Sequence, residues 1–187
     1  MSYRRAASVA ALAGAAFLGA CDNIPPSLRL VPEAGTMAVA KVQPRNGSTV
    51  RGTISFTQRG SRVYISANFV DLWPGPHSLY IHAVGNCSSA NAASAGPVWN
   101  AAGAAQGGKR TGDLPQLNAG TEGNAVLQIS TADLSVGTGA ANDVIGHSVI
   151  VHQSLDPDPK AEWGVRNGWL GCGVIERNQG LDLKKLL

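Results

Sequence analysis

Two short stretches decide the fold of this chain, Leu79-Tyr80-Ile81-His82 and Ser148-Val149-Ile150-Val151-His152. Each is a mostly apolar run that contains β-branched or aromatic residues and ends on a histidine, and such runs favour extended backbone. Between them in the chain lies the triplet Gly112-Asp113-Leu114, and after them comes Cys172-Gly173-Val174-Ile175. The sequence therefore predicts two histidine-bearing strands with an acidic loop residue between them.

Further strand-like runs lie on both sides of these stretches. The chain has 23 Gly and 10 Pro residues, which suits short strands joined by turns better than helices. Arg59-Gly60-Ser61 predicts the turn of a hairpin. Two irregular segments, 84–117 and 153–168, are long enough to indicate functional loops. The predicted strands are 37–42, 52–57, 62–69, 78–83, 125–129, 148–152 and 171–176, and they favour an all-β Greek-key barrel or sandwich with two long loops.

The N-terminus has the pattern of a targeting segment. Arg4 and Arg5 precede an apolar run at 6–20, which is shorter than the about 20 residues that span a bilayer. The run ends in Leu18-Gly19-Ala20-Cys21, which resembles the lipobox of bacterial lipoproteins. An ordinary signal peptide with a chance cysteine is the alternative. We expect a signal peptide at 1–20, a tether at 21–35, a domain at 36–177 and a tail at 178–187, with lipidated Cys21 on the periplasmic face of a membrane in the bacterial envelope.

Composition and charge exclude several function classes. Hydrophobic residues make up 44% of the chain and charged residues 14%, so a packed core is expected. The formal net charge of +3 falls to about +1 without Arg4 and Arg5, which gives no reason to expect a nucleic-acid partner. No nucleophile-elbow, P-loop or dinucleotide motif is present. The predicted partner is the membrane, through Cys21, and a homodimer stays open.

The chain has three cysteines. If Cys21 carries lipid, Cys87 and Cys172 remain as one pair. Export to an oxidising compartment favours a disulfide between them, and two free buried thiols are the alternative.

Five segments, in order, resemble the Cu/Zn superoxide dismutase family and especially its bacterial periplasmic branch. Gly112-Asp113-Leu114-Pro115 matches the family's Gly-Asp-Leu-Pro, and 171–175 resembles its Ala-Cys-Gly-Val-Ile. The other three segments are 75–82, 85–100 and 145–152. The resemblance covers about 37–175 and implies a Greek-key β-barrel, a Cys87–Cys172 disulfide and superoxide dismutation at a copper and zinc centre.

The resemblance also assigns metal positions, and most of them have changed. Copper positions of the family fall on Tyr80, His82, Val98 and His152, where Val98 stands for the histidine that the two metals share. Zinc positions fall on Val98, Gln106, Arg110 and Asp113. The nearby cationic residue falls on Trp169, and a supporting aspartate falls on Asp156.

These changes predict different fates for the two metals. A zinc site needs about four N, S or O ligands, and a guanidinium has no lone pair to offer. We therefore expect zinc to be lost and Arg110 to pair with Asp113. His82, His152 and Tyr80 form a candidate residual copper site, because imidazole suits copper. Trp99 and Trp169 are expected to fill the pocket with apolar bulk.

Two functions remain in competition at this stage. One is a non-catalytic pseudoenzyme or interaction domain of the family. The alternative is a superoxide dismutase or copper-binding protein that uses His82 and His152. His77 and His147 are interpreted as packing or surface residues, since His147 points to the strand face opposite His152.

Overall fold

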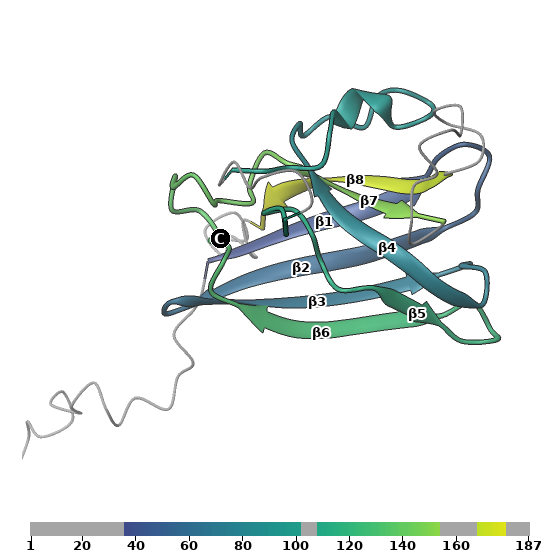
Figure 1. Ribbon diagram of the computed structural model, residues 1–187, viewed down its shortest axis with the longest axis horizontal. Coiled ribbons are helices and arrows are strands. Elements are labelled where there is room, and N and C mark those ends of the chain that lie inside the picture. Colours follow the sequence, from purple (N-terminus) through teal and green to yellow (C-terminus); the bar gives the residue numbers. More distant parts are fainter. Residues whose placement is uncertain (1–35, 102–107, 154–167, 179–187) are drawn as a thin grey trace, which may run out of the picture. The chain divides into compact units, whose positions relative to one another are not determined.

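A computed structural model of the protein describes residues 36–101, 108–153 and 168–178, and its regular structure is almost entirely β-strand (Figure 1). In these ranges the helical structure is one 3-10 turn, η2 (Ala93–Ala95), and no helix there is long and apolar enough to cross a membrane. The strands are β1 (Met37–Pro44), β2 (Arg51–Arg59), β3 (Arg62–Val70), β4 (Gly75–His82), β5 (Leu117–Ala119), β6 (Ala125–Thr131), β7 (Ser148–His152) and β8 (Trp169–Arg177).

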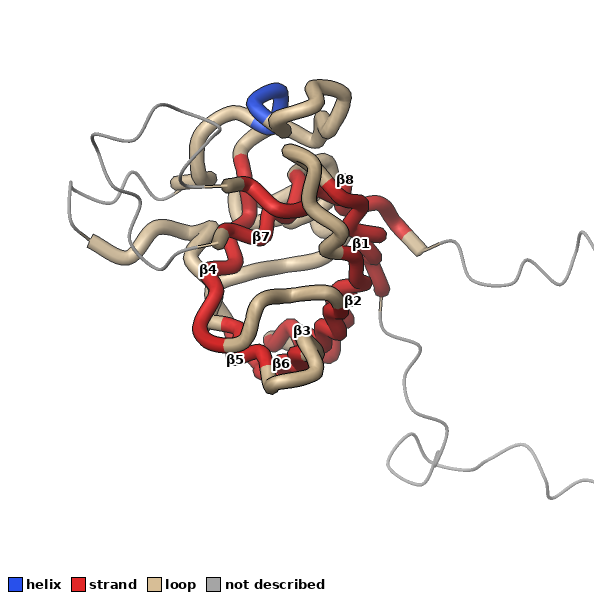
Figure 2. Tube along the Cα trace, turned by 90° about the vertical axis from the view of Figure 1, so that its right-hand side faces the viewer, coloured by secondary structure: helices blue, strands red, loops and turns tan. Residues whose placement is uncertain are grey.

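All neighbouring strands pair antiparallel, in the order β5-β4-β7-β8-β1-β2-β3-β6. The sheet curls so that its two edge strands, β5 and β6, approach each other, and Figure 2 shows the strands surrounding a central core. The predicted all-β barrel is therefore confirmed. The predicted hairpin is confirmed as well, because Arg59 pairs with Arg62 across a turn in which Gly60 has φ +54°.

Alternation of side chains builds the core. Along β3, Val63, Ile65, Ala67 and Phe69 are buried, and the residues between them are exposed or nearly so. Phe56 of β2 and Leu79 of β4 are fully buried as well. Each large apolar side chain that is removed from water contributes about 1.5–3 kcal/mol, so this core supplies the main stabilising force.

The structure also contains a strand that the sequence pattern does not predict. β5 begins at the last residue of segment 84–117, continues past it to Ala119, and pairs with the start of β4, from Gly75 to His77. Leu117 and Ala119 are buried while Asn118 is exposed, so the alternation is real but covers only three residues. A run that short carries no reliable periodicity.

A disulfide joins Cys87 to Cys172 with an S–S distance of 2.01 Å. It ties the loop after β4 to β8 and confirms the predicted pair; the alternative of free thiols is wrong. Its ends are 85 residues apart, and closing a loop of that length stabilises a fold by about 4 kcal/mol in the chain-entropy account. Arg45 reinforces the same loop, since its Nη2 donates to the Cys87 carbonyl oxygen at 2.7 Å.

Several predicted features lie outside the described residues. These are the signal peptide, Cys21 and the tether at 1–35, the former zinc position Gln106, the supporting Asp156, and the tail after Asn178.

Candidate metal centre

His82 and His152 are the last residues of the paired strands β4 and β7. Their Nε2 atoms lie 3.4 Å apart, and both side chains are buried, at 1% and 7% exposure. The pairing of β7 with β8 is irregular between Val151 and His152. Such bulges re-aim side chains, which fits the convergence of the two rings.

The hydrogen bonds of His82 define which of its nitrogens is available. Its Nδ1 lies 2.7 Å from the Gly96 carbonyl oxygen, so Nδ1 carries the proton and donates it. The lone pair of His82 Nε2 then faces His152. That nitrogen can accept a proton from His152 or, together with His152 Nε2, offer two lone pairs to a metal ion.

Burial keeps both imidazoles neutral. It lowers the pKa of His82, where the charge of Arg110 adds to the effect and the Gly96 carbonyl opposes it. Burial, then the neighbouring His82 and then Arg110 lower the pKa of His152 to about 3. Neutral imidazole is the form that binds metals, so the pair is in a ligating state at neutral pH.

Two aromatic side chains complete what we call the aromatic cluster, defined as Tyr80, His82, His152 and Trp169. The Tyr80 ring meets His152 edge-on at 4.9 Å between centroids. The Trp169 ring lies 5.1 Å from His82 and 5.6 Å from His152. Trp169 thus packs against both imidazoles, as expected.

The residues predicted at zinc positions that the structure describes, Val98, Arg110 and Asp113, lie on loop segments that flank β4. Val98 forms an isolated bridge with His82, and Asp113 forms one with Tyr80. Gly112 allows the segment that carries Asp113 to lie against β4. Its carbonyl oxygen accepts from Ile81 N at 2.8 Å, and an added Cβ would collide with the Ile81 carbonyl oxygen. Only glycine fits there.

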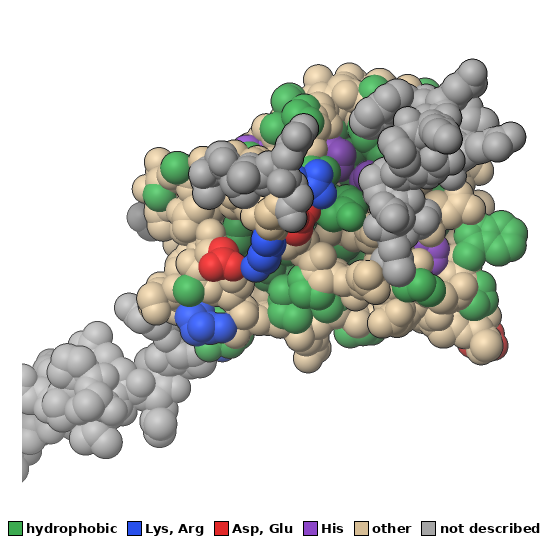
Figure 3. All heavy atoms as spheres, in the orientation of Figure 1, with side chains coloured by type: hydrophobic (Ala, Val, Ile, Leu, Met, Phe, Trp, Pro, Cys, Tyr) green, Lys and Arg blue, Asp and Glu red, His purple; other side chains and the backbone are tan. Residues whose placement is uncertain are grey.

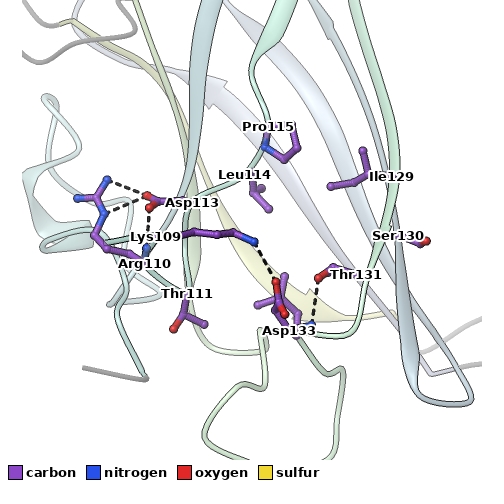
Figure 4. A pocket seen from close by; sticks show the side chains of 11 residues that line it. Lys109, Arg110, Thr111, Asp113, Leu114, Pro115, Ile129, Ser130, Thr131 and Asp133 are labelled. Atoms are coloured by element: carbon purple, nitrogen blue, oxygen red, sulfur yellow. Dashed lines mark hydrogen bonds and ion pairs between the residues drawn. The ribbon is translucent and has the colours of Figure 1, made fainter. Parts of the chain in front are cut away.

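Arg110 and Asp113 form the predicted ion pair, which is thereby confirmed (Figure 4). Arg110 Nη2 and Nε lie 2.8 and 2.9 Å from Asp113 Oδ1, and the Arg110 backbone N–H donates to Oδ2 at 2.7 Å. Both carboxylate oxygens are therefore engaged. The guanidinium carbon also lies 5.2 Å from the centroid of the Tyr80 ring.

The residues on the zinc side do not fit zinc. Val98 has no donor atom, Arg110 cannot ligate, and Asp113 already accepts two hydrogen bonds from Arg110 and forms an ion pair with its Nη2. Across the described ranges, no three His, Cys, Asp or Glu residues are grouped so that they could hold a metal ion. On the copper side, His82 and His152 are buried and neutral, and their Nε2 atoms converge. They could supply two of the ligands of a copper ion.

The two remaining histidines have packing roles. His77 is buried with its ring between the carbonyl oxygens of Trp73, at 2.7 Å, and His152, at 3.2 Å. His147 stacks on Trp99 at 3.9 Å between centroids. Trp99 therefore packs with His147 and the core cluster, and Trp169 is the tryptophan that contacts the two imidazoles.

A surface pocket of about 830 Å³ opens beside the ion pair (Figure 4). Its floor is apolar, with Leu114, Ile129 and Leu134, and Lys109 and Asp133 form an ion pair of 2.9 Å at its rim. The sequence carried no signal for this pocket, because its walls come from the segment 109–115, from β6 and from the loop after β6.

The structure is an antiparallel β-barrel with a disulfide-held loop, and its candidate metal centre is formed by the last residues of β4 and β7 next to loops that flank β4. The family described as copper/zinc superoxide dismutase (SODC) matches residues 50–175, which is more than half of the chain. The chain therefore belongs to the Cu/Zn superoxide dismutase family. It is also similar to the extracellular superoxide dismutase [Cu-Zn] of Brugia pahangi, with 29% identity over 168 residues that cover 82% of each chain.

Proposed function

We propose that this protein is an exported, lipid-anchored and non-catalytic member of the Cu/Zn superoxide dismutase family, of the bacterial periplasmic type, which acts as an interaction domain. The observation that carries the proposal is the Arg110–Asp113 ion pair at the zinc positions. It puts a fixed cation where a divalent cation would have to bind.

Charge and hydrogen bonding both act against zinc. Zinc would have to displace two hydrogen bonds and an ion pair from Asp113 and would meet the Arg110 guanidinium at short range. The same guanidinium lowers the pKa of both His82 and His152, so its field reaches the copper side as well. The Arg110 guanidinium therefore disfavours the binding of a cation at either metal position.

The copper side has lost the features that help an anion react. Trp169 stands where the family has a cationic residue, and its ring packs against both imidazoles. Val98 supplies no ligand between the two metal positions. Fast dismutation needs an open metal coordination position and a route for superoxide, and this arrangement favours neither.

Two observations support export. The Cys87–Cys172 disulfide suits an oxidising compartment. The name of the Brugia pahangi relative describes an extracellular enzyme. The lipid anchor rests on Leu18-Gly19-Ala20-Cys21, whose cysteine follows small residues as a lipobox requires.

The decisive test reinstates imidazoles in the full-length mature protein. We expect the unmodified protein to bind no zinc after incubation and dialysis, as measured by elemental analysis. The Val98→His, Gln106→His, Arg110→His triple variant should bind about one zinc per chain. Val98→His, Gln106→His, Arg110→Gln is the matched control, because it removes the cation without supplying the last imidazole. Stoichiometric zinc in the unmodified protein would overturn the proposal.

The 3.4 Å separation of the His82 and His152 Nε2 atoms favours a second candidate function, copper binding. Copper would supply one-electron chemistry there, held by these two nitrogens with Tyr80 beside them. The test is copper affinity of the full chain against the His82→Ala, His152→Ala double variant. His77→Gln serves as a control, because it removes a buried imidazole outside the pair. Affinity lost only in the double variant would establish this function, and superoxide consumption by that copper form would refute the non-catalytic proposal.

A further inference from the structure

We propose that the end of the barrel where the chain enters β1 docks on anionic phospholipid headgroups; this inference rests on the proposed lipid anchor at Cys21. We call this surface the basic end and define it by Arg59, Arg62, Arg177 and Tyr64. All four side chains are exposed, and Tyr64 is 45% exposed.

Strand pairing brings the three arginines around the entry point of the domain. Arg177 of β8 pairs with Ala38 on one side of β1. On the other side, Gln58 N donates to the Thr36 carbonyl oxygen at 2.9 Å, next to the turn at which Arg59 pairs with Arg62. The first described residues of the domain are thus flanked by arginines from two directions.

The basic end also carries an aromatic residue of the kind found at membrane interfaces. The Arg59 guanidinium carbon lies 5.4 Å from the Tyr64 ring centroid. Tyrosine places an apolar ring and a polar hydroxyl at headgroup depth, while arginine binds phosphate oxygens. Figure 3 shows Lys and Arg side chains at this end of the visible face.

Acidic groups near the basic end offset only part of its charge. The Asp143 carboxylate accepts from the amides of Gly137, Gly139 and Ile145. Glu176 shares a surface depression of about 410 Å³ with Lys41 and Arg177, so Lys41 balances it. Asp133 lies within electrostatic range of Arg62, and Lys109 pairs with it at 2.9 Å. With Glu176 and Asp133 each offset by a lysine, the three arginines leave an excess of positive charge at this end, although the chain without its signal peptide is nearly neutral.

The anchor would hold the basic end close to lipid. Fourteen residues, 22–35, separate Cys21 from Thr36, and a fully extended chain of that length spans at most about 50 Å. Tethering raises the effective concentration of the surface at the bilayer, so a weak contact becomes significant. Each arginine near an anionic surface favours binding by a few-fold, so removing two should reduce docking by on the order of tenfold.

The test compares hydrogen exchange of the full-length acylated protein in phosphatidylcholine vesicles with and without phosphatidylglycerol. We expect slower exchange at the turn amides of Gly60 and Ser61 with phosphatidylglycerol, and reversal by high salt because the attraction is screened. In the Arg59→Gln, Arg177→Gln variant, the slowing of exchange by phosphatidylglycerol should be on the order of tenfold smaller. Arg51→Gln, Arg110→Gln has the same net charge, removes cations that pair with Asp71 and Asp113 instead, and should keep it.

The outcomes separate docking from anchoring. Equal exchange in both vesicle types, or equal loss in the two double variants, would overturn docking while flotation of the acylated protein still supports the anchor. If mass spectrometry shows that the N-terminal peptide carries no acyl chains, the lipid anchor is refuted. Cosedimentation of that unacylated chain with the anionic vesicles would then decide docking alone: salt-sensitive binding supports it and absence of binding overturns it.

Discussion

The two halves of the candidate metal centre differ in structure. On the copper side, His82 and His152 remain as buried, neutral imidazoles at the ends of strands. On the zinc side, loop residues form a partly exposed ion pair, with 40% of the Arg110 side chain and 24% of the Asp113 side chain accessible. A buried strand residue is constrained by its packing neighbours, whereas a loop residue is freer to change. Burial, ring packing and the hydrogen bond of His82 to Gly96 are thus enough to hold these two histidines in place.

Gly112→Ala should have the largest effect on this comparison, because it breaks the contact between the two halves. The new Cβ would collide with the Ile81 carbonyl oxygen and force the zinc-side segment away from β4. We expect a loss of about 3 kcal/mol or more in unfolding free energy, measured by urea denaturation. Gly120→Ala is the control, since its Cβ would meet Asn124 O at 4.0 Å. Equal stabilities of the two variants would contradict the close approach.

Acidification should weaken the copper side specifically. The folded-state pKa of His152 is about 3 and that of His82 is also lowered, so the unfolded chain takes up protons first as the pH falls. Stability is therefore full above about pH 6.5 and declines below it by about 1.4 kcal/mol per pH unit for His152, and the lowered pKa of His82 acts in the same direction. Urea unfolding of metal-free protein between pH 7 and 5 measures the slope. His152→Gln should flatten it, and an unchanged slope in that variant would show that burial of His152 is not its cause.

Arg110→Gln should have a small effect, because the ion pair on the zinc side is partly exposed. Screening by solvent limits such a pair to about 1 kcal/mol or less. A double-mutant cycle with Asp113→Asn measures the coupling by urea unfolding. A coupling free energy well above that value would contradict this, and would mean that the ion pair is shielded from solvent in the way the two buried histidines are.

Lys109→Gln should have the smallest effect. Its partner Asp133 lies at the pocket rim, and their side chains are 71% and 64% exposed. We expect a change in unfolding free energy close to zero, within the error of the same urea measurement. A loss as large as that of Arg110→Gln would show that the pocket rim supports the zinc-side segment.

Much of the fold could be predicted from the sequence where a pattern was long enough. Strands such as 62–69 alternate over eight residues, and the hairpin turn and the cysteine pair have strong local signals. The Arg110–Asp113 pair was predictable because an arginine at a position where the resemblance implies a zinc ligand lies three residues before an aspartate of opposite charge. β5 was not, because three residues carry no period. The bridge of Val98 to His82 and the stacking of His147 on Trp99 depend on loop paths that no local pattern specifies.

The disulfide has a consequence for how this protein reaches its native state. The loop after β4 is held by Cys87–Cys172, by Arg45, and by backbone bonds such as Val84 N to Ala95 O at 2.9 Å. None of these needs a metal ion. Together with the proposed loss of zinc, this predicts that maturation of the domain depends on the supply of oxidising equivalents rather than on the supply of zinc. A cell starved of metal should still accumulate the folded protein, whereas a cell deficient in thiol oxidation should not.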